Sequence, residues 1–174
     1  IKLSHNFSEF ILGSFSLSLL FLIRGYELLS NEGCFGLITQ NNMFTSLSGK
    51  NVRKYLQEEK AIKRIIDFGY HKIFPNVNAY TCLLFLTKSR NTRFDFETFS
   101  YNNNLERKKL ENLDFSKIDY QLLDYNKWRL AKGVHLENLH KIENIGLSLG
   151  TIADIKVGFA TLKDKVFLVK NILK

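Results

Sequence analysis

Three short apolar segments narrow the choice of folds for this 174-residue chain more than any other feature. They span residues 34–38, 62–68 and 79–87, and each has the length of a single strand. The first of them is a continuous apolar run, which is typical of a strand that is covered on both faces of a parallel sheet. We therefore predict an α/β fold in which residues 34–38 form a central strand.

The second and third apolar segments are separated by only about a dozen residues. A helical crossover between parallel strands hardly fits into so short a connection. We therefore predict that residues 62–68 and 79–87 form an antiparallel pair at the edge of the sheet.

Two helices are expected beside this sheet. Residues 10–23 are strongly apolar but too short for the roughly 20 residues of a membrane span, and they lack the features of a signal peptide. We predict a helix here that is buried on most sides, in a cytoplasmic protein of a bacterium or archaeon. Ser48 is the expected cap of a second helix, in which Val52, Tyr55 and Leu56 face inward.

The composition changes after Lys88, where the chain becomes polar, rich in asparagine and charged. A new apolar pattern starts near Gly146 and suggests a hairpin around residues 163–165. We therefore expect a first domain over residues 1–90, a connector with one or two short elements over 91–140, and the start of another domain over 141–174.

The net charge of +8 favours a polyanionic partner, although a solvated basic surface accounts for it equally well. Cys34 and Cys82 both lie in apolar runs and are expected to be reduced core residues, with a disulfide as the alternative. The four histidines are scattered, and their spacing predicts no metal site.

Several segments, taken in order, resemble the gamma-type adenine-N6 DNA methyltransferases, the TaqI-like and related fused restriction–methylation enzymes of type II restriction–modification systems. Each match is weak alone, and the order and spacing of the matches carry the resemblance. They are residues 27–39 (LL-x-x-G-G-x-x-x-x-I-x-P in the family), 49–56 (G-x-x-x-R-x-x-L), 65–68, 73–81 (V-F-x-x-x-x-V), 146–155 (G-x-x-L-x-D-I-x-x-I) and 158–161 (G-x-x-T).

The resemblance implies part of a Rossmann-like sheet that binds S-adenosylmethionine, with an antiparallel edge strand, followed by the start of a target-recognition domain. It implies methyl transfer to adenine-N6 in duplex DNA. The family holds the target amine with an Asn-Pro-Pro loop, which the single proline, Pro75, excludes from these residues. We therefore expect a fragment that is inactive alone, that partners with the missing amino-terminal half of the enzyme, and that has no membrane association.

Two aromatic residues match the family's ligand-binding positions. Phe74 matches the position that stacks on the extruded target base, with a hydrophobic plug at a turn as the alternative. Phe21 matches the position that stacks on the adenine of the cofactor, with a core phenylalanine as the alternative. Ser16 and Ser18 stand where the family often has an acidic residue or asparagine and a tyrosine.

Other residues are candidates for DNA contact, with an exposed polar or basic face as the alternative in each case. The polar residues 39–42 follow the first strand and either face DNA or turn the chain. The basic and hydroxyl candidates are Lys50, Arg53, Lys54, Lys63, Arg64, Thr161, Lys163 and Lys165.

Two other functions remain open at this point. The chain is alternatively a non-catalytic specificity module that docks on a partner subunit and helps to bind DNA. It is otherwise a fragment of an RNA or protein methyltransferase, or a basic RNA-binding protein with a similar fold.

Overall fold

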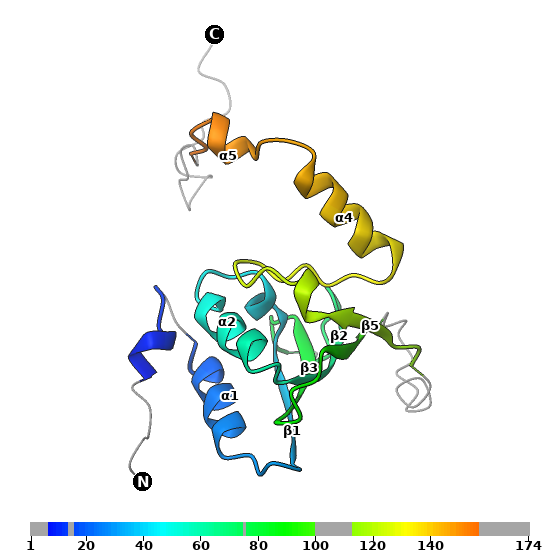
Figure 1. The fold of residues 1–174 in the computed structure, drawn as a ribbon. Coiled ribbons are helices and arrows are strands. Elements are labelled where there is room, and N and C mark those ends of the chain that lie inside the picture. Colours follow the sequence, from blue (N-terminus) through cyan, green and yellow to red (C-terminus); the bar gives the residue numbers. More distant parts are fainter. Residues whose placement is uncertain (1–6, 14–15, 75, 100–112, 157–174) are drawn as a thin grey trace. The chain divides into compact units, whose positions relative to one another are not determined.

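A computed structural model describes residues 7–13, 16–74, 76–99 and 113–156 of the chain (Figure 1). The chain divides into two compact units, residues 1–137 and residues 138–174. The first unit contains a sheet with helices packed against it, and it is the part that matters for the site described below.

The sheet has five strands in the order β1-β3-β2-β4-β5. Their bounds are Cys34–Gln40 (β1), Ile62–Asp67 (β2), Thr81–Thr87 (β3), Arg93–Thr98 (β4) and Ser116–Asp119 (β5). Strand β3 is antiparallel to both β1 and β2, β4 is parallel to β2, and β5 is antiparallel to β4. Strands β1, β2 and β4 therefore share one direction, so their carboxyl ends lie at the same edge of the sheet.

Helix α1 (Leu17–Glu27) precedes β1, and helix α2 (Lys50–Glu58) lies between β1 and β2. Figure 1 shows both helices on one side of the sheet. Short 3-10 turns complete this unit: η1 (Phe7–Phe10), η2 (Asn41–Phe44) directly after β1, and η3 (Tyr120–Leu122) directly after β5.

Alternate residues of the central strands face two apolar clusters, as the period of two along a strand requires. Ile65 of β2 and Leu84 of β3 belong to the main core, together with the inner residues of α1 and α2. Ile66 and Phe68 belong to a second, smaller cluster on the other face of the sheet, which also includes Phe99. Both faces of β3 are therefore covered, which explains its almost continuously apolar sequence, whereas β2 also carries Lys63, Arg64 and Asp67.

The antiparallel pair of β2 and β3 was predicted correctly, but its position at the sheet edge was not. Strand β3 lies between β1 and β2, and it is β1 that pairs with β3 alone among the described strands. Cys34 at the start of β1 is exposed rather than part of the core, and the described cysteines are both free. The predicted central strand of residues 34–38 is therefore an edge strand of this sheet.

The residues expected as a connector after residue 90 contribute two strands to the same sheet. Phe94 and Phe96 of β4 and Ile118 of β5 are buried in the main core. Charged residues alternate with these phenylalanines, so the segment has a polar composition and an apolar inner face at once. The compact unit extends to residue 137, well beyond the predicted boundary.

Helix α1 is less buried than predicted, because only one of its faces packs against the sheet. Leu22 and Ile23 are fully buried, whereas Leu17 and Phe21 are each 70% exposed. Helix α2 forms as predicted, but Ser48 does not cap it: the N-cap residue is Gly49, and the Ser48 hydroxyl donates to the Ser46 hydroxyl instead.

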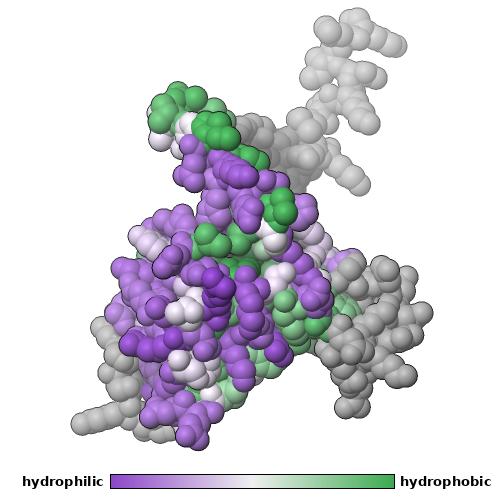
Figure 2. Space-filling model, turned by 45° about the vertical axis from the view of Figure 1, so that its right-hand side comes forward, coloured by the Kyte–Doolittle hydropathy of each residue, from purple (hydrophilic) through white to green (hydrophobic). Residues whose placement is uncertain are grey.

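The later residues contain helix α4 (Val134–Asn144), which crosses the division between the units, and the short helix α5 (Leu149–Ile152). The predicted hairpin around residues 163–165 lies outside the described residues. Within the described ranges, none of the helices has the length and apolar character needed to span a bilayer. Hydrophilic residues cover most of the face shown in Figure 2, with apolar residues gathered in smaller areas.

Candidate functional site

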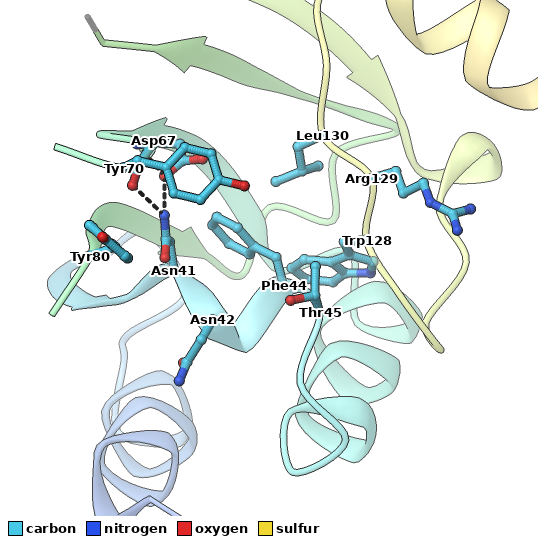
Figure 3. Close-up of a pocket in the computed structure, with 11 residues that line it drawn as sticks. Asn41, Asn42, Phe44, Thr45, Asp67, Tyr70, Tyr80, Trp128, Arg129 and Leu130 are labelled. Carbon is cyan, nitrogen blue, oxygen red and sulfur yellow. Dashed lines mark hydrogen bonds between the residues drawn. The ribbon is translucent and has the colours of Figure 1, made fainter. Parts of the chain in front are cut away.

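A cavity of about 440 Å³ opens at the carboxyl ends of β1 and β2 (Figure 3). Three segments line it: residues 41–45 after β1, residues 67–70 at the end of β2, and residues 128–130 after η3, with Tyr80 before β3. In open α/β sheets, ligands bind outside the carboxyl ends of the strands. This cavity is therefore the candidate site.

A polar pair joins the ends of the two strands at this cavity. The side-chain amide of Asn41 donates to Asp67 Oδ1 at 2.9 Å and to the carbonyl of Gly69 at 2.9 Å, and the first of these bonds is visible in Figure 3. The backbone N–H of Gly69 also donates to Asp67 Oδ1, at 3.0 Å. The Asp67 carboxylate is thereby fixed beside the cavity, which Asn41 and Asn42 of the polar segment 39–42 also line.

Two tyrosines stand at the cavity. Tyr70 is 88% exposed and Tyr80 is 42% exposed, and their rings meet edge to face with centroids 5.6 Å apart. The backbone of Tyr80 accepts a hydrogen bond from the N–H of Asn41 at 3.0 Å, which fixes the loop that carries this tyrosine. These exposed rings give the cavity flat apolar surfaces next to the polar pair.

Phe74 lies on the same loop, between Tyr70 and Tyr80, and its side chain is 42% exposed. It is not packed in the hydrophobic interior, and the strands on both sides of its loop are neighbours in the sheet. Phe74 is not among the residues that line the cavity, whereas the two tyrosines are. The loop therefore offers three partly or largely exposed aromatic rings.

Trp128 forms the opposite wall of the cavity and is 1% exposed. Its backbone N–H donates to the carbonyl of Phe44 at 2.8 Å, and its indole N–H donates to Gln57 Oε1 at 3.3 Å. Its ring lies 6.4 Å, centroid to centroid, from the ring of Phe44 on η2. One wall of the cavity is thus held against the turn that follows β1.

Arg53 was predicted to contact DNA from the exposed side of α2, and the structure shows the opposite. The residue is fully buried. Its guanidinium donates to four backbone carbonyls, those of Met43 (2.5 Å), Ser46 (2.9 Å), Tyr125 (2.8 Å) and Asn126 (2.6 Å). Burial lowers the pKa of this guanidinium, and the nearby Asp124 carboxylate acts in the opposite direction. Arg53 is therefore an internal link between two segments.

The other predicted DNA-binding residues of α2 remain at the surface. The Lys50 and Lys54 ammonium groups lie 5.6 and 5.8 Å from the centroid of the Tyr125 ring, and Lys54 also approaches Glu58 at 3.8 Å. Lys50, Lys54 and Tyr125 thus form one basic and aromatic surface.

The strand residues among the basic candidates differ from each other. Lys63 is exposed, whereas Arg64 is paired with Asp95 at 3.0 Å and lies over the Phe115 ring at 4.2 Å. Arg64 thus forms an ion pair between β2 and β4, with a side chain that is 39% exposed. Thr161, Lys163 and Lys165 lie outside the described residues.

A second, more polar hollow of about 380 Å³ lies near the start of α1 and the end of β1. Ser16, Ser18 and Thr39 line it, and the Thr39 hydroxyl is buried without a hydrogen-bond partner in the structure. Phe21, the predicted cofactor residue, is one turn further along α1 and 70% exposed, so it is not a core phenylalanine. Phe21 is not among the residues that line this hollow.

Comparison with known proteins shows what this chain is similar to. Residues 2–74 match the family model of the Eco57I restriction-modification methylase. This match covers α1, β1, α2, β2 and the start of the loop that carries Tyr70, Phe74 and Tyr80. The chain is thus similar to the methylases of restriction–modification systems.

The individual relatives agree with this class. The type II restriction enzyme and methyltransferase RM.Eco57I of Escherichia coli is 32% identical over 157 residues, which are 88% of this chain and 16% of that protein. The predicted relationship to restriction–modification methyltransferases is therefore confirmed. The chain spans about a sixth of the length of this relative.

Two solved structures share the fold. One is the methyltransferase subunit of a type I restriction–modification system from Streptococcus thermophilus, with a TM-score of 0.52 and 23% identity over 64% of this chain and 29% of that chain. The other is the type IIG restriction endonuclease BpuSI, with a TM-score of 0.52 and 15% identity over 79% of this chain and 16% of that chain.

Sequence reasoning missed most of the residues that line the cavity, among them Tyr70, Tyr80 and Trp128. The two tyrosines flank Phe74, so an aromatic cluster in a loop after a predicted strand was a usable signal. Trp128 lies 84 residues after Phe44, its partner in the wall, and local sequence carries no sign of such a distant contact.

Proposed function

We propose that this chain is part of the catalytic domain of a DNA methyltransferase that transfers a methyl group from S-adenosylmethionine to adenine-N6 in duplex DNA, and that the cavity at the carboxyl ends of β1 and β2 receives the extruded adenine. The single observation that carries the proposal is that two exposed aromatic rings, those of Tyr70 and Tyr80, line this cavity together with the fixed Asn41–Asp67 pair. The relationship to restriction–modification methyltransferases supports it.

An adenine that leaves the duplex loses the stacking of its neighbours, which costs a few kcal/mol. Stacking on an aromatic ring returns roughly 1–3 kcal/mol per base. Phe74 is the proposed stacking ring, and Tyr70 and Tyr80 line the space beside it. The Asn41 and Asp67 side chains supply polar groups for the edge of a base.

The remaining parts of the proposal concern the whole enzyme. S-adenosylmethionine supplies the methyl group when it is bound, and Phe21 is the proposed ring beside the adenine of this cofactor. The five strands form part of a Rossmann-like sheet, and the residues after 140 begin a target-recognition domain. Because the Asn-Pro-Pro loop of the family is absent from these 174 residues, they do not transfer methyl groups alone.

Lys50 and Lys54, with Tyr125 between them, form the proposed contact to the DNA backbone. This contact would serve a non-catalytic specificity module equally well. Mixing the chain with the amino-terminal half of a related enzyme separates the two functions, since a catalytic part restores transfer of labelled methyl groups to DNA and a specificity module binds DNA without restoring it.

Fluorescence anisotropy with labelled oligonucleotides tests the base-binding site directly. We expect tighter binding to a duplex with a mismatched adenine than to the matched duplex, because less pairing is lost on extrusion. Phe74→Ala and Tyr70→Ala are expected to reduce this preference, whereas Tyr125→Ala weakens binding to both duplexes and leaves their ratio unchanged. Equal affinity for the two duplexes, or tighter binding to single-stranded RNA, would contradict the proposal.

A further inference from the structure

We propose that Arg53 is a positioning residue that holds the cavity in shape by tying its floor to its wall. Here the floor is residues 41–46, and the strap is residues 123–130, which carry the wall. The ligand concerned is the extruded base, so this part rests on the proposed function, but the link itself can be tested without any ligand.

The two ends of the link belong to different parts of the cavity. Two of the four carbonyls that Arg53 contacts, those of Met43 and Ser46, belong to the floor, and the other two, of Tyr125 and Asn126, belong to the strap. Asn41, Asn42, Phe44 and Thr45 of the floor and Trp128, Arg129 and Leu130 of the strap line the cavity. One side chain therefore fixes both surfaces between which a base would lie.

An arginine suits this position because its planar guanidinium presents five N–H donors in a fixed arrangement. In this structure Nε, Nη1 and Nη2 all donate, and Nη1 donates twice. A lysine has three donors on one atom and cannot reach carbonyls on both sides in the same way. The buried charge is compensated by four carbonyl dipoles, so loss of either end leaves polar groups without partners.

Gly49, one turn before Arg53, makes room for the link. A Cβ atom at Gly49 would lie 2.6 Å from the carbonyl oxygen of Met43 and 2.7 Å from Nη1 of Arg53. Real Cβ atoms do not approach other atoms this closely, so any side chain here displaces the guanidinium or the floor. The spacing Gly49-x-x-x-Arg53, which resembles the family's pattern, therefore places a residue without a side chain where the guanidinium meets the floor.

Trp128 provides a fluorescence signal for the position of the strap. Trp128 is the only tryptophan of the chain and lies two residues after Asn126, the last acceptor of the link. Its emission therefore measures whether the wall stays buried against Phe44 and Gln57. A change in this emission in a folded variant is not expected from a residue that only adds stability.

The test compares Arg53→Met, Arg53→Lys and Gly49→Ala with the wild-type chain and with Arg93→Met. Arg93 is 64% exposed and pairs with Asp119 at the surface, so its replacement removes the same charge without touching the cavity. For each Arg53 or Gly49 variant with a native circular dichroism spectrum, we expect a red-shifted Trp128 emission and stronger quenching by acrylamide, with a smaller change in Arg53→Lys. Arg93→Met should retain the wild-type emission. Gly49→Ala retains every N–H donor of Arg53, so it provides the test if Arg53→Met does not fold.

Binding of the mismatched duplex supplies the second measurement. The cavity variants are expected to lose affinity on the order of tenfold or more, since small displacements in a binding site have large effects. Wild-type Trp128 emission in all folded cavity variants would overturn the proposal, even if their stability falls. If the wild-type chain shows no preference for the mismatched duplex, the proposed function fails, and the Trp128 measurement still decides whether the link exists.

Discussion

Helices α1 and α2 pack against the same side of the sheet, yet they differ in the kinds of residue that are buried and exposed. Helix α1 has apolar residues inside and outside: Leu22 is fully buried, and Leu17 and Phe21 are each 70% exposed. Helix α2 has a cation inside, Arg53, and charged residues outside, Lys54 and Glu58. Hydrophobicity alone would have placed Phe21 inside and Arg53 outside.

The contrast shows that burial is decided by the available partner rather than by the polarity of a side chain. Arg53 is buried because four carbonyls accept its protons. Phe21 is exposed because the sheet covers only one side of α1 in the part of the chain that the structure describes. Substitutions on the inner and outer faces of the two helices can test this distinction.

The largest effect is expected on the inner face of α1. Leu22→Ala removes a fully buried side chain and should lower the free energy of unfolding by about 2–5 kcal/mol, because apolar contacts are lost and a void remains. Leu17→Ala, on the outer face of the same helix, should change it by no more than about 0.5 kcal/mol. Urea denaturation of both variants measures the difference, and equal losses would show that the outer face is also packed.

A smaller effect is expected where α1 meets β1. A Cβ atom at Gly25 would lie 2.4 Å from Cζ of Phe35, so Gly25→Ala should cost about 1–3 kcal/mol of stability through overpacking. Adding Phe35→Leu should recover part of this loss, because a smaller side chain leaves room for the methyl group. A double-mutant cycle checks this coupling, and additive losses would contradict the close contact.

The third effect is confined to alkaline solution and concerns the junction of the two helices. Tyr26 of α1 and Tyr55 of α2 meet edge to face, with centroids 5.9 Å apart. Burial, assisted by Glu59 and Glu27, raises the pKa of Tyr55 from 10.0 to about 12, and burial also raises the pKa of Tyr26.

In the unfolded chain these phenols lose their protons near pH 10, while in the folded chain they retain them. Their contribution to stability is therefore fully present below pH 10 and is lost as the pH rises from 10 toward 12. Urea unfolding at a series of pH values should show this decline, and Tyr55→Phe should reduce it. A stability that stays constant up to pH 12 would show that the ring is hydrated.

The smallest effect is expected on the outer face of α1. Phe21→Ser should change the free energy of unfolding by less than about 0.5 kcal/mol, because the ring is mainly in solvent. The same variant, combined with the amino-terminal half of a related enzyme, should bind S-adenosylhomocysteine more weakly in calorimetry. Unchanged binding would remove Phe21 from the proposed cofactor site.

The strands β1, β2 and β3 were predictable from short segments with apolar residues at their centres, and their pairing was predictable only in part. Residues 62–68 and 79–87 form an antiparallel pair as expected, because the connection between them is too short for a crossover. The insertion of β3 between β1 and β2 could not be deduced, since apolar runs of the same composition fit several orders in a sheet. Strand β4 was hidden because its charged residues dominate the local composition.

The candidate site was predictable in its location and not in its members. The polar residues after the first strand pointed to the edge of the sheet where the cavity lies, and Asn41 lines that cavity. Arg53 was misplaced because a periodicity argument assigns every cation to the outer face of a helix. Its partners at residues 125 and 126 are distant in sequence, and only the folded chain brings them together.

The link made by Arg53 also has a consequence for biosynthesis. Two of its acceptors lie 72 and 73 residues further along the chain, so they leave the ribosome long after α2 does. At a synthesis rate of roughly 5–20 residues per second, this interval lasts about 4–15 s. During this time the guanidinium keeps its hydration water, and α2 cannot complete its packing on the nascent polypeptide until the later segment emerges.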